Sequence, residues 1–182
     1  KVLGITHCVS WNSAAALLVD GKIVSINEEE RFTRKKHALE DGHAAFPKES
    51  ITECLSHGEI TAQDVDLVCI GWNKNTICGN NSPDSVKFVE SYTEKTLNGL
   101  KDIGFDLSKV NFYNHHLCHA ASTFFCSGHG FSNIVSLDGA GDDCSGWMGF
   151  SEGAFANRYD INSHQANPSS FNQVVQCDNS WG

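Results

Sequence analysis

The sequence lacks three features that would have pointed to particular classes of protein. It has no apolar run approaching the roughly 18 residues that a membrane-spanning helix needs. It has no excess of basic residues, because 13 Lys and Arg stand against 22 Asp and Glu, for a net charge of −9. Its 8 cysteines contain no CxxC pair and no dense cluster. These absences argue against a spanning protein, a nucleic-acid-binding protein and a secreted disulfide scaffold. We therefore expect reduced thiols and a cytoplasmic location.

The order of apolar segments predicts an α/β fold. The 182 residues are 40% hydrophobic, which is typical of a globular chain. Asp20-Gly21 lies between two apolar runs and is a strong signal for a two-residue hairpin. The charged stretch 29–46 has little periodicity and is expected to be a loop. The expected strands cover 2–9, 13–19, 22–28, 64–72, 109–114, 133–138, 145–150 and 155–161, and the expected helices cover 47–57, 84–103 and 117–127.

The last three expected strands repeat the pattern of the first three. A strand meander followed by crossover helices predicts a mixed sheet with helices on its faces. This order resembles the ribonuclease-H-like unit of the actin, sugar-kinase and Hsp70 superfamily, whose members bind nucleotide phosphates between two such units. We expect a first unit at 1–128 and the incomplete start of a second at 129–182, so that the chain is an N-terminal piece of a longer protein.

The sharpest chemical feature is the run His115-His116-Leu117-Cys118-His119, where an expected strand becomes a helix. If the helix already includes this run, His115 and His119 lie on one face, because residues four apart are one turn above each other, and they can chelate one divalent ion while His116 points elsewhere. No third ligand can be identified from the sequence. The alternative is that these are helix-end and core histidines.

A second feature is the turn Asp138-Gly139-Ala140-Gly141-Asp142 after an apolar strand. Glycines let backbone N–H groups approach a phosphate, and an acid there can orient a metal or a water molecule. The alternative is an ordinary hairpin. A third feature is the charged stretch 28–37, whose cations could bind an anionic ligand or form a solvated surface.

Several segments, in chain order, together resemble one family, the carbamoyltransferases of the NodU and CmcH type. The opening segment over 2–47, with its E-E-E-R-F-T-R-K-K-H run and its F-P, is similar to the start of that family. The pattern H-H-x-x-H-A-A-S-x-F-F matches His115–Phe125, and D-G-x-G-E/D matches Asp138–Asp142. The family's N-S-L-G matches Asn179–Gly182, with Trp181 in place of Leu.

The resemblance implies an ATP-dependent O-carbamoyltransferase of two domains. A C-terminal YrdC-like domain, absent from this chain, would make carbamoyl-adenylate from carbamoyl phosphate and ATP. The N-terminal domain, which resembles a threonylcarbamoyl-transfer enzyme, would pass the carbamoyl group to a hydroxyl of a small-molecule acceptor. No nucleic acid or membrane partner is expected. The resemblance also implies a divalent metal (Fe, Zn or Mn) on His115 and His119, with a further aspartate ligand that lies beyond this chain.

The same resemblance suggests roles for other residues. Asp138, with Gly139 and Gly141, matches the nucleotide-phosphate turn and is also a catalytic candidate. Ser13 is expected in the first phosphate loop. Lys36, a further catalytic candidate, is expected in the basic segment on the substrate side.

One departure from the family pattern is Trp11-Asn12, where His-Asp is usual. It removes an imidazole and a carboxylate, and His7 is the candidate to compensate. Two other functions stay open, namely an ATP-binding kinase or ATPase of the same superfamily, and a module that has lost activity. The present chain alone is expected to be inactive.

Overall fold

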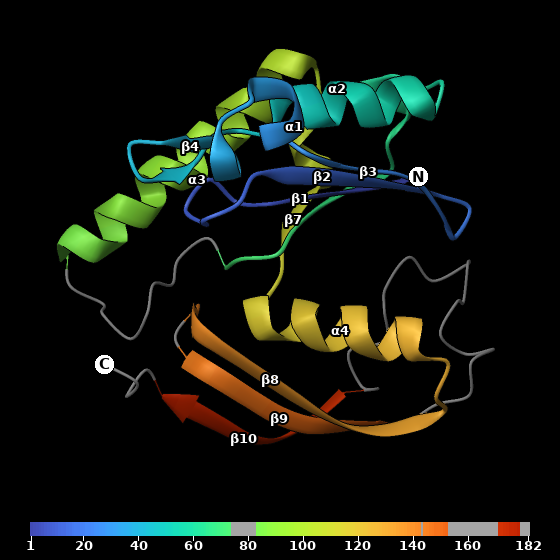
Figure 1. Ribbon diagram of the computed structural model, residues 1–182, viewed down its shortest axis with the longest axis vertical. Coiled ribbons are helices and arrows are strands. Elements are labelled where there is room, and N and C mark those ends of the chain that lie inside the picture. Colours follow the sequence, from blue (N-terminus) through green and yellow to red (C-terminus); the bar gives the residue numbers. More distant parts are fainter. Residues whose placement is uncertain (74–82, 143, 153–170, 179–182) are drawn as a thin grey trace. The chain divides into compact units, whose positions relative to one another are not determined.

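The computed structural model describes residues 1–73, 83–142, 144–152 and 171–178 (Figure 1). The chain forms two compact units. The first contains the described residues up to Tyr113, and the second begins at Asn114. This division lies earlier than the predicted boundary after residue 128. The reason is that helix α4 (His115–Ser127) packs Ala120 and Phe124 against Ile134 and Trp147 of the second unit.

The first unit is built on a mixed five-stranded sheet, as the sequence predicted. Its strands lie in the order β3-β2-β1-β6-β7, with antiparallel pairing from β3 to β1 and parallel pairing from β1 to β7. Asp20 and Gly21 both have positive φ, at 50° and 74°, which confirms the predicted hairpin turn. The strands are β1 (Val2–Ile5), β2 (Ala14–Val19), β3 (Lys22–Glu28), β6 (Leu67–Ile70) and β7 (Val110–Phe112).

Two predicted helices complete this unit, α2 (Lys48–His57) and α3 (Pro83–Ile103). Their apolar side chains share one core with the strands, and Leu3, Leu17, Ile51 and Leu100 are fully buried in it. The expected loop at 29–46 instead contains short elements. These are α1 (Glu30–Thr33), the 3-10 turn η1 (Lys36–Ala38), and the paired strands β4 (Leu39–Glu40) and β5 (His43–Ala44). Two further 3-10 turns are η2 (Ala62–Asp64) and η3 (Leu107–Lys109).

One buried carboxylate explains how α2 begins. Pro47 precedes the helix and provides no side-chain cap. Glu29 fills that role from a distant point in the chain, because its two carboxylate oxygens accept hydrogen bonds from the backbone N–H groups of Glu49 (3.0 Å) and Ser50 (2.8 Å). A carboxylate at a helix N-terminus satisfies orphan donors and complements the helix dipole. Glu29 thus joins the end of β3 to the start of α2.

Among its described residues, the second unit contains α4 and a three-stranded antiparallel sheet, ordered β10-β9-β8. The predicted strands at 133–138 and 145–150 lie within β8 (Phe131–Gly141) and β9 (Cys144–Glu152). The strand β10 (Phe171–Asp178) was not predicted, since its Asn and Gln residues obscure the apolar pattern. The strand expected at 155–161 lies outside the described residues. Within the part of the chain that the structure describes, no helix is long and apolar enough to cross a membrane.

Candidate metal centre

The first turn of α4 is held by two side chains that accept hydrogen bonds from its backbone. Asn114 accepts from the N–H of Leu117 at 2.9 Å, as an N-cap residue does. Asp142 accepts from the N–H of His115 at 2.7 Å, and its side chain is buried. Asp142 has a positive φ of 54° immediately after β8, which places its carboxylate at the helix start. The two contacts fix the position of His115 and, one turn later, of His119.

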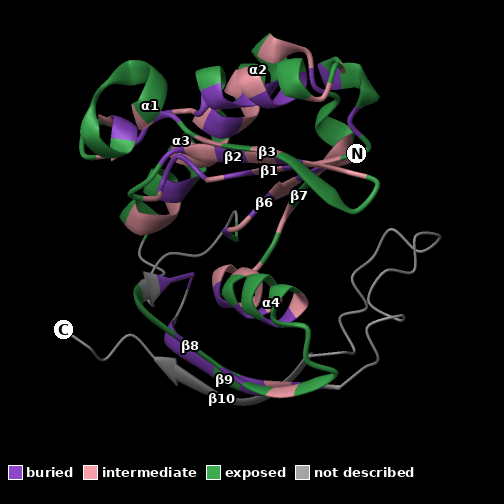
Figure 2. Cartoon of the chain, turned by 45° about the vertical axis from the view of Figure 1, so that its right-hand side comes forward, coloured by how far each residue is buried: buried purple, intermediate pink, exposed green. Residues whose placement is uncertain are grey.

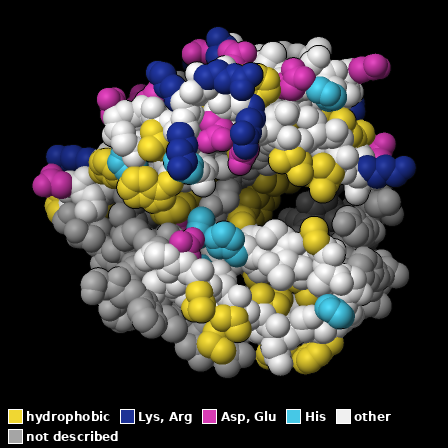
Figure 3. Space-filling view, in the orientation of Figure 1, with side chains coloured by type: hydrophobic (Ala, Val, Ile, Leu, Met, Phe, Trp, Pro, Cys, Tyr) yellow, Lys and Arg dark blue, Asp and Glu magenta, His cyan; other side chains and the backbone are white. Residues whose placement is uncertain are grey.

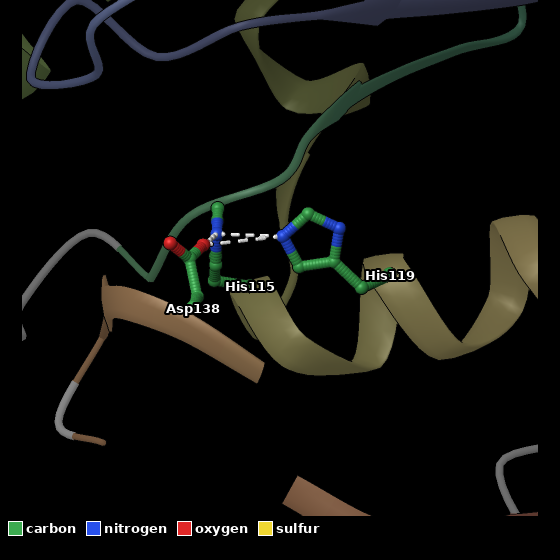
Figure 4. Close-up of side chains that lie close together, drawn as sticks. All are labelled: His115, His119 and Asp138. Carbon is green, nitrogen blue, oxygen red and sulfur yellow. Dashed lines mark hydrogen bonds and ion pairs between the residues drawn. The ribbon is translucent and has the colours of Figure 1, made fainter. Parts of the chain in front are cut away.

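Three polar side chains converge at this end of α4 (Figure 4). The Nε2 atom of His115 lies 2.8 Å from Oδ2 of Asp138 and 3.0 Å from Nε2 of His119. The Nε2 atom of His119 lies 3.3 Å from the same Asp138 oxygen. Two imidazoles from one helix face and a carboxylate from β8 therefore aim one ligand atom each at a common point. The prediction that His115 and His119 share a helix face is confirmed.

These distances fit the requirements of a divalent ion. Metal bonds of about 2.0–2.1 Å to imidazole nitrogen or carboxylate oxygen set neighbouring ligand atoms about 3.0–3.4 Å apart. The three separations here, 2.8, 3.0 and 3.3 Å, lie close to that range. Imidazole with carboxylate is a donor set suited to Zn, Fe or Mn. Three protein ligands also leave coordination positions open for a substrate, as catalytic sites require.

The electrostatics of the cluster favour an ionised carboxylate. Partial burial alone would raise the pKa of Asp138, but hydrogen bonds from His115 and from the Gly139 N–H outweigh it and lower the pKa. The side chains remain accessible, with exposed fractions of 18% for His115, 35% for Asp138 and 51% for His119. An open hollow of about 470 Å³ is lined by Leu137, Asp138, Gly139 and Ser145. Figure 3 shows histidine side chains beside an acidic one on the surface.

The surroundings of the cluster explain its local sequence. His116 is fully buried and its Nδ1 lies 2.9 Å from Oγ of Ser136, so it points away from the cluster as predicted. A Cβ atom at Gly141 would collide with the ring of His115 and lie 3.0 Å from Nε2 of His116. A Cβ atom at Gly139 would meet nothing within 4 Å. Only the second glycine of the turn is therefore needed for close packing against α4.

The structure adds a candidate third ligand to the two histidines. The sequence offers no third ligand, and the expected role of Asp138 in a phosphate turn stays a prediction. The fold places Asp138 beside the two histidines, because β8 runs antiparallel to β9 and ends next to the first turn of α4. Sequence reasoning also missed Ser136 and Asp142 as supports of the histidines. Their only sequence signal was proximity to the glycine turn.

The other predicted site residues belong to the first unit. His7 is buried, its Nδ1 accepts from the N–H of Val9 at 3.0 Å, and its Nε2 lies 3.2 Å from Oγ1 of Thr93. Burial lowers the pKa of His7 to about 4, so the ring is neutral near pH 7. Ser13 is buried and donates to the carbonyl of Ala45 at 2.7 Å. These contacts support structural roles, and the functional roles of both residues stay predictions.

Lys36 lies in η1 and is exposed, as its expected contact with an anionic ligand requires. Figure 3 shows several Lys and Arg side chains on the visible face of the first unit.

The structure also shows the contacts of Trp11 and Asn12, which depart from the family pattern. Oδ1 of Asn12 lies 2.7 Å from Nδ1 of His37, and the Trp11 ring stacks on His43 with centroids 5.5 Å apart. The expected role of Lys36 on the substrate side and the expected role of Gly139 and Gly141 in a nucleotide-phosphate turn remain predictions.

Comparison with known proteins identifies the family of this chain. The family model described as "Carbamoyltransferase N-terminus" matches residues 1–154. The chain belongs to this carbamoyltransferase family. It is 32% identical over 161 residues to "Nodulation protein NolNO" of Sinorhizobium fredii (strain NBRC 101917 / NGR234), a match that covers 83% of the chain and 23% of the relative. It is 31% identical over 164 residues to "Uncharacterized protein sll1178" of Synechocystis sp. (strain ATCC 27184 / PCC 6803 / Kazusa), covering 78% of the chain and 26% of the relative.

The chain thus spans about a quarter of the length of these curated relatives. Among solved structures it is similar to YeaZ from Pseudomonas aeruginosa, with a TM-score of 0.45 and 10% identity. That match covers 97% of the chain and 66% of the YeaZ chain. A second structure, an uncharacterized protein with similarity to peptidase YEAZ from Pseudomonas aeruginosa, has a TM-score of 0.43 and 11% identity over 96% and 63% of the two chains.

Proposed function

We propose that this chain is the acyl-transfer part of an ATP-dependent O-carbamoyltransferase. In this proposal it receives carbamoyl-adenylate and passes the carbamoyl group to a hydroxyl of a small-molecule acceptor. The observation that carries the proposal is the convergence of His115, His119 and Asp138 in a member of the carbamoyltransferase family. We further propose that the two units are a ribonuclease-H-like unit and the beginning of a second one, and that the adenylate is made by a YrdC-like domain elsewhere in the whole protein.

At the carbamoyl carbon, the proposed reaction breaks one bond and forms one. The acceptor oxygen attacks the carbamoyl carbon, the bond from that carbon to the adenylate phosphate oxygen breaks, and AMP leaves with the electron pair. The acceptor hydroxyl loses its proton to a nearby base or to water. A divalent ion, when bound, would stabilise the negative charge that develops on the phosphate or the carbamoyl oxygen.

The residues of this chain have separate tasks in the proposal. His115 and His119 would hold the ion through their Nε2 atoms, and Asp138 would provide the anionic ligand. The Gly139 N–H donates to Oδ1 of Asp138 at 2.6 Å, which leaves Oδ2 directed at the two imidazoles. Lys36 binds the anionic part of the donor, since it is exposed in a basic segment.

The test is a transfer assay with the full-length protein. The protein is incubated with ATP, carbamoyl phosphate, a divalent metal, and a panel of sugars and hydroxyl-bearing antibiotics, and products are identified by mass spectrometry. We expect a carbamate ester from the wild type. We expect the Asp138→Asn variant to lose at least about 100-fold in rate, because a metal-supported transition state loses its anionic ligand.

The matched control is His129→Ala, because His129 is an exposed histidine outside the cluster. This variant should retain the wild-type rate. A phosphorylated product in place of a carbamate would favour the kinase alternative. If Asp138→Asn forms the carbamate as fast as the wild type, the cluster has no role in the transfer.

A further inference from the structure

Trp11 is a large apolar side chain that the first unit leaves in contact with water. It lies in the segment between β1 and β2 and is 67% exposed. Its ring stacks on that of His43, with ring centroids 5.5 Å apart and ring planes 24° from parallel. Because one face of the indole lies against His43 and most of the side chain is exposed, the opposite face is open. A rigid aromatic ring of this kind can stack on a flat ligand.

The imidazole of His43, which supports the indole, is itself held from several sides. Its Nδ1 lies 3.2 Å from the carbonyl oxygen of Val9. Its ring also contacts Phe88 and Tyr92 of α3, with centroids 5.1 and 4.8 Å away, and these two rings contact each other. The support under Trp11 is therefore ordered before any ligand arrives, which lowers the entropic cost of binding.

A pair of neutral polar side chains accompanies the tryptophan. Asn12 follows Trp11 in the chain, and its Oδ1 lies 2.7 Å from Nδ1 of His37. The Nδ1–H of His37 donates this hydrogen bond, so Nε2 of the neutral ring is an acceptor. Both side chains are exposed, and among the described residues neither Nε2 of His37 nor Nδ2 of Asn12 has a hydrogen-bond partner. The pair thus offers one acceptor and one donor to a ligand.

The backbone around His37 holds the imidazole in an unusual position. The His37 N–H donates to Oε2 of Glu30 at 2.7 Å. The φ angles of Arg34, His37 and Ala38 are positive, at 59°, 60° and 48°. Residues with side chains seldom adopt this conformation, and such positions concentrate at binding sites. Residues 31–37 are all exposed, and Figure 2 shows the segment around α1 mostly in the colour of exposed residues.

We propose that Trp11, Asn12 and His37 bind a pyranose ring. The apolar C–H face of the sugar stacks on the open face of the indole. One hydroxyl donates to Nε2 of His37, and another accepts from Nδ2 of Asn12. A pyranose combines an apolar face with neighbouring hydroxyls, and a hydroxyl can rotate to donate or to accept, so a sugar matches both polar groups without a fixed donor pattern. The proposal concerns binding alone and is independent of carbamoyl transfer.

The test is a titration of the full-length protein with methyl glucoside, methyl galactoside and methyl mannoside, without ATP or carbamoyl phosphate. Binding is followed by saturation-transfer NMR on the sugar protons. We expect at least one glycoside to bind with a Kd of about 1 mM or below. Saturation should be strongest at the axial C–H groups of one ring face. Trp11→Ala should raise the Kd at least about tenfold, and Trp11→Phe should stay within about threefold of the wild type.

Asn12→Ala should weaken binding by about three- to tenfold, because it removes one hydrogen bond to the sugar and the contact that orients His37. The matched control is Phe131→Ala, which removes an aromatic ring that is 58% exposed in the second unit. It should leave the Kd unchanged, and circular dichroism should show that each variant is folded. The proposal is wrong if none of the three glycosides binds, or if Trp11→Ala or Asn12→Ala binds as tightly as the wild type. Adenosine bound at Trp11 in place of the glycosides would also overturn it, since the indole would then serve a nucleobase.

Discussion

At the scale of single residues, His7 has a protonation state that the fold fixes. Its Nδ1 accepts a hydrogen bond from the Val9 N–H, so the proton of the neutral ring is on Nε2, facing Thr93. Protonating the ring would break the Val9 contact and bury a charge, and burial accordingly lowers the pKa from 6.5 to about 4.

This pKa shift predicts a pH dependence of stability. Between pH 6.5 and pH 4 the unfolded chain binds a proton at His7 that the folded chain does not bind. The stabilising contribution is therefore complete above pH 6.5 and is lost as the pH falls toward 4, by about 3 kcal/mol in total. Urea unfolding at pH 7 and pH 4.5 should show a smaller loss of unfolding free energy for His7→Asn than for the wild type. The control variant His129→Asn, changed at an exposed position, should lose as much unfolding free energy between the two pH values as the wild type does. Equal losses for His7→Asn and the wild type would show that His7 is not the titrating group.

At the scale of elements, the metal cluster depends on how closely the end of β8 approaches the first turn of α4. The carboxylate of Asp142 accepts a hydrogen bond from the His115 N–H, and Ser136 contacts His116. Gly141 lies against the rings of His115 and His116. The strand therefore supplies the candidate ligand Asp138 and holds His115 and the neighbouring His116 in place. Supports of this kind typically change metal affinity by about 10- to 100-fold when they are removed.

The two glycines of the turn provide a matched pair of variants. Gly141→Ala should weaken metal binding by about 10- to 100-fold, because the added methyl group displaces the His115 ring. Gly139→Ala should bind metal as the wild type does, because its methyl group has open space. The Zn²⁺ affinities of the full-length variants are compared by calorimetric titration. Equal affinities for both variants would contradict the geometry assigned to the end of β8.

The elements also show what the sequence could and could not predict. Period and turn chemistry predicted the opening hairpin at Asp20-Gly21, the mixed sheet and a helix over 117–127, which the structure extends back to His115. They could not predict that α4 belongs with β8 and β9, because that grouping depends on packing between Phe124 and Trp147. They also missed Asp138 as a neighbour of the histidines, since a contact between residues 19 and 23 positions apart leaves no periodic signal. The buried capping role of Glu29 was hidden in a charged run for the same reason.

At the scale of the whole molecule, the described fold provides a candidate metal centre within one of two compact units. The chain is a member of the carbamoyltransferase family and spans about a quarter of the curated relatives it matches. In the proposed function, the centre in this chain serves transfer, while the chemistry that activates the carbamoyl group belongs to another part of the protein. The proposed transfer therefore depends on the cluster binding a metal.

The most direct test is metal binding by the full-length protein and by its His119→Ala variant. The metal-free proteins are titrated with Zn²⁺, Mn²⁺ and, without oxygen, Fe²⁺, and the bound ion is located by anomalous diffraction. We predict one ion per chain on His115, His119 and Asp138, at least about 100-fold weaker binding by His119→Ala, and unchanged binding by His129→Ala. If His119→Ala binds each ion as tightly as the wild type, or if the ion lies away from these three side chains, the proposed metal centre is wrong.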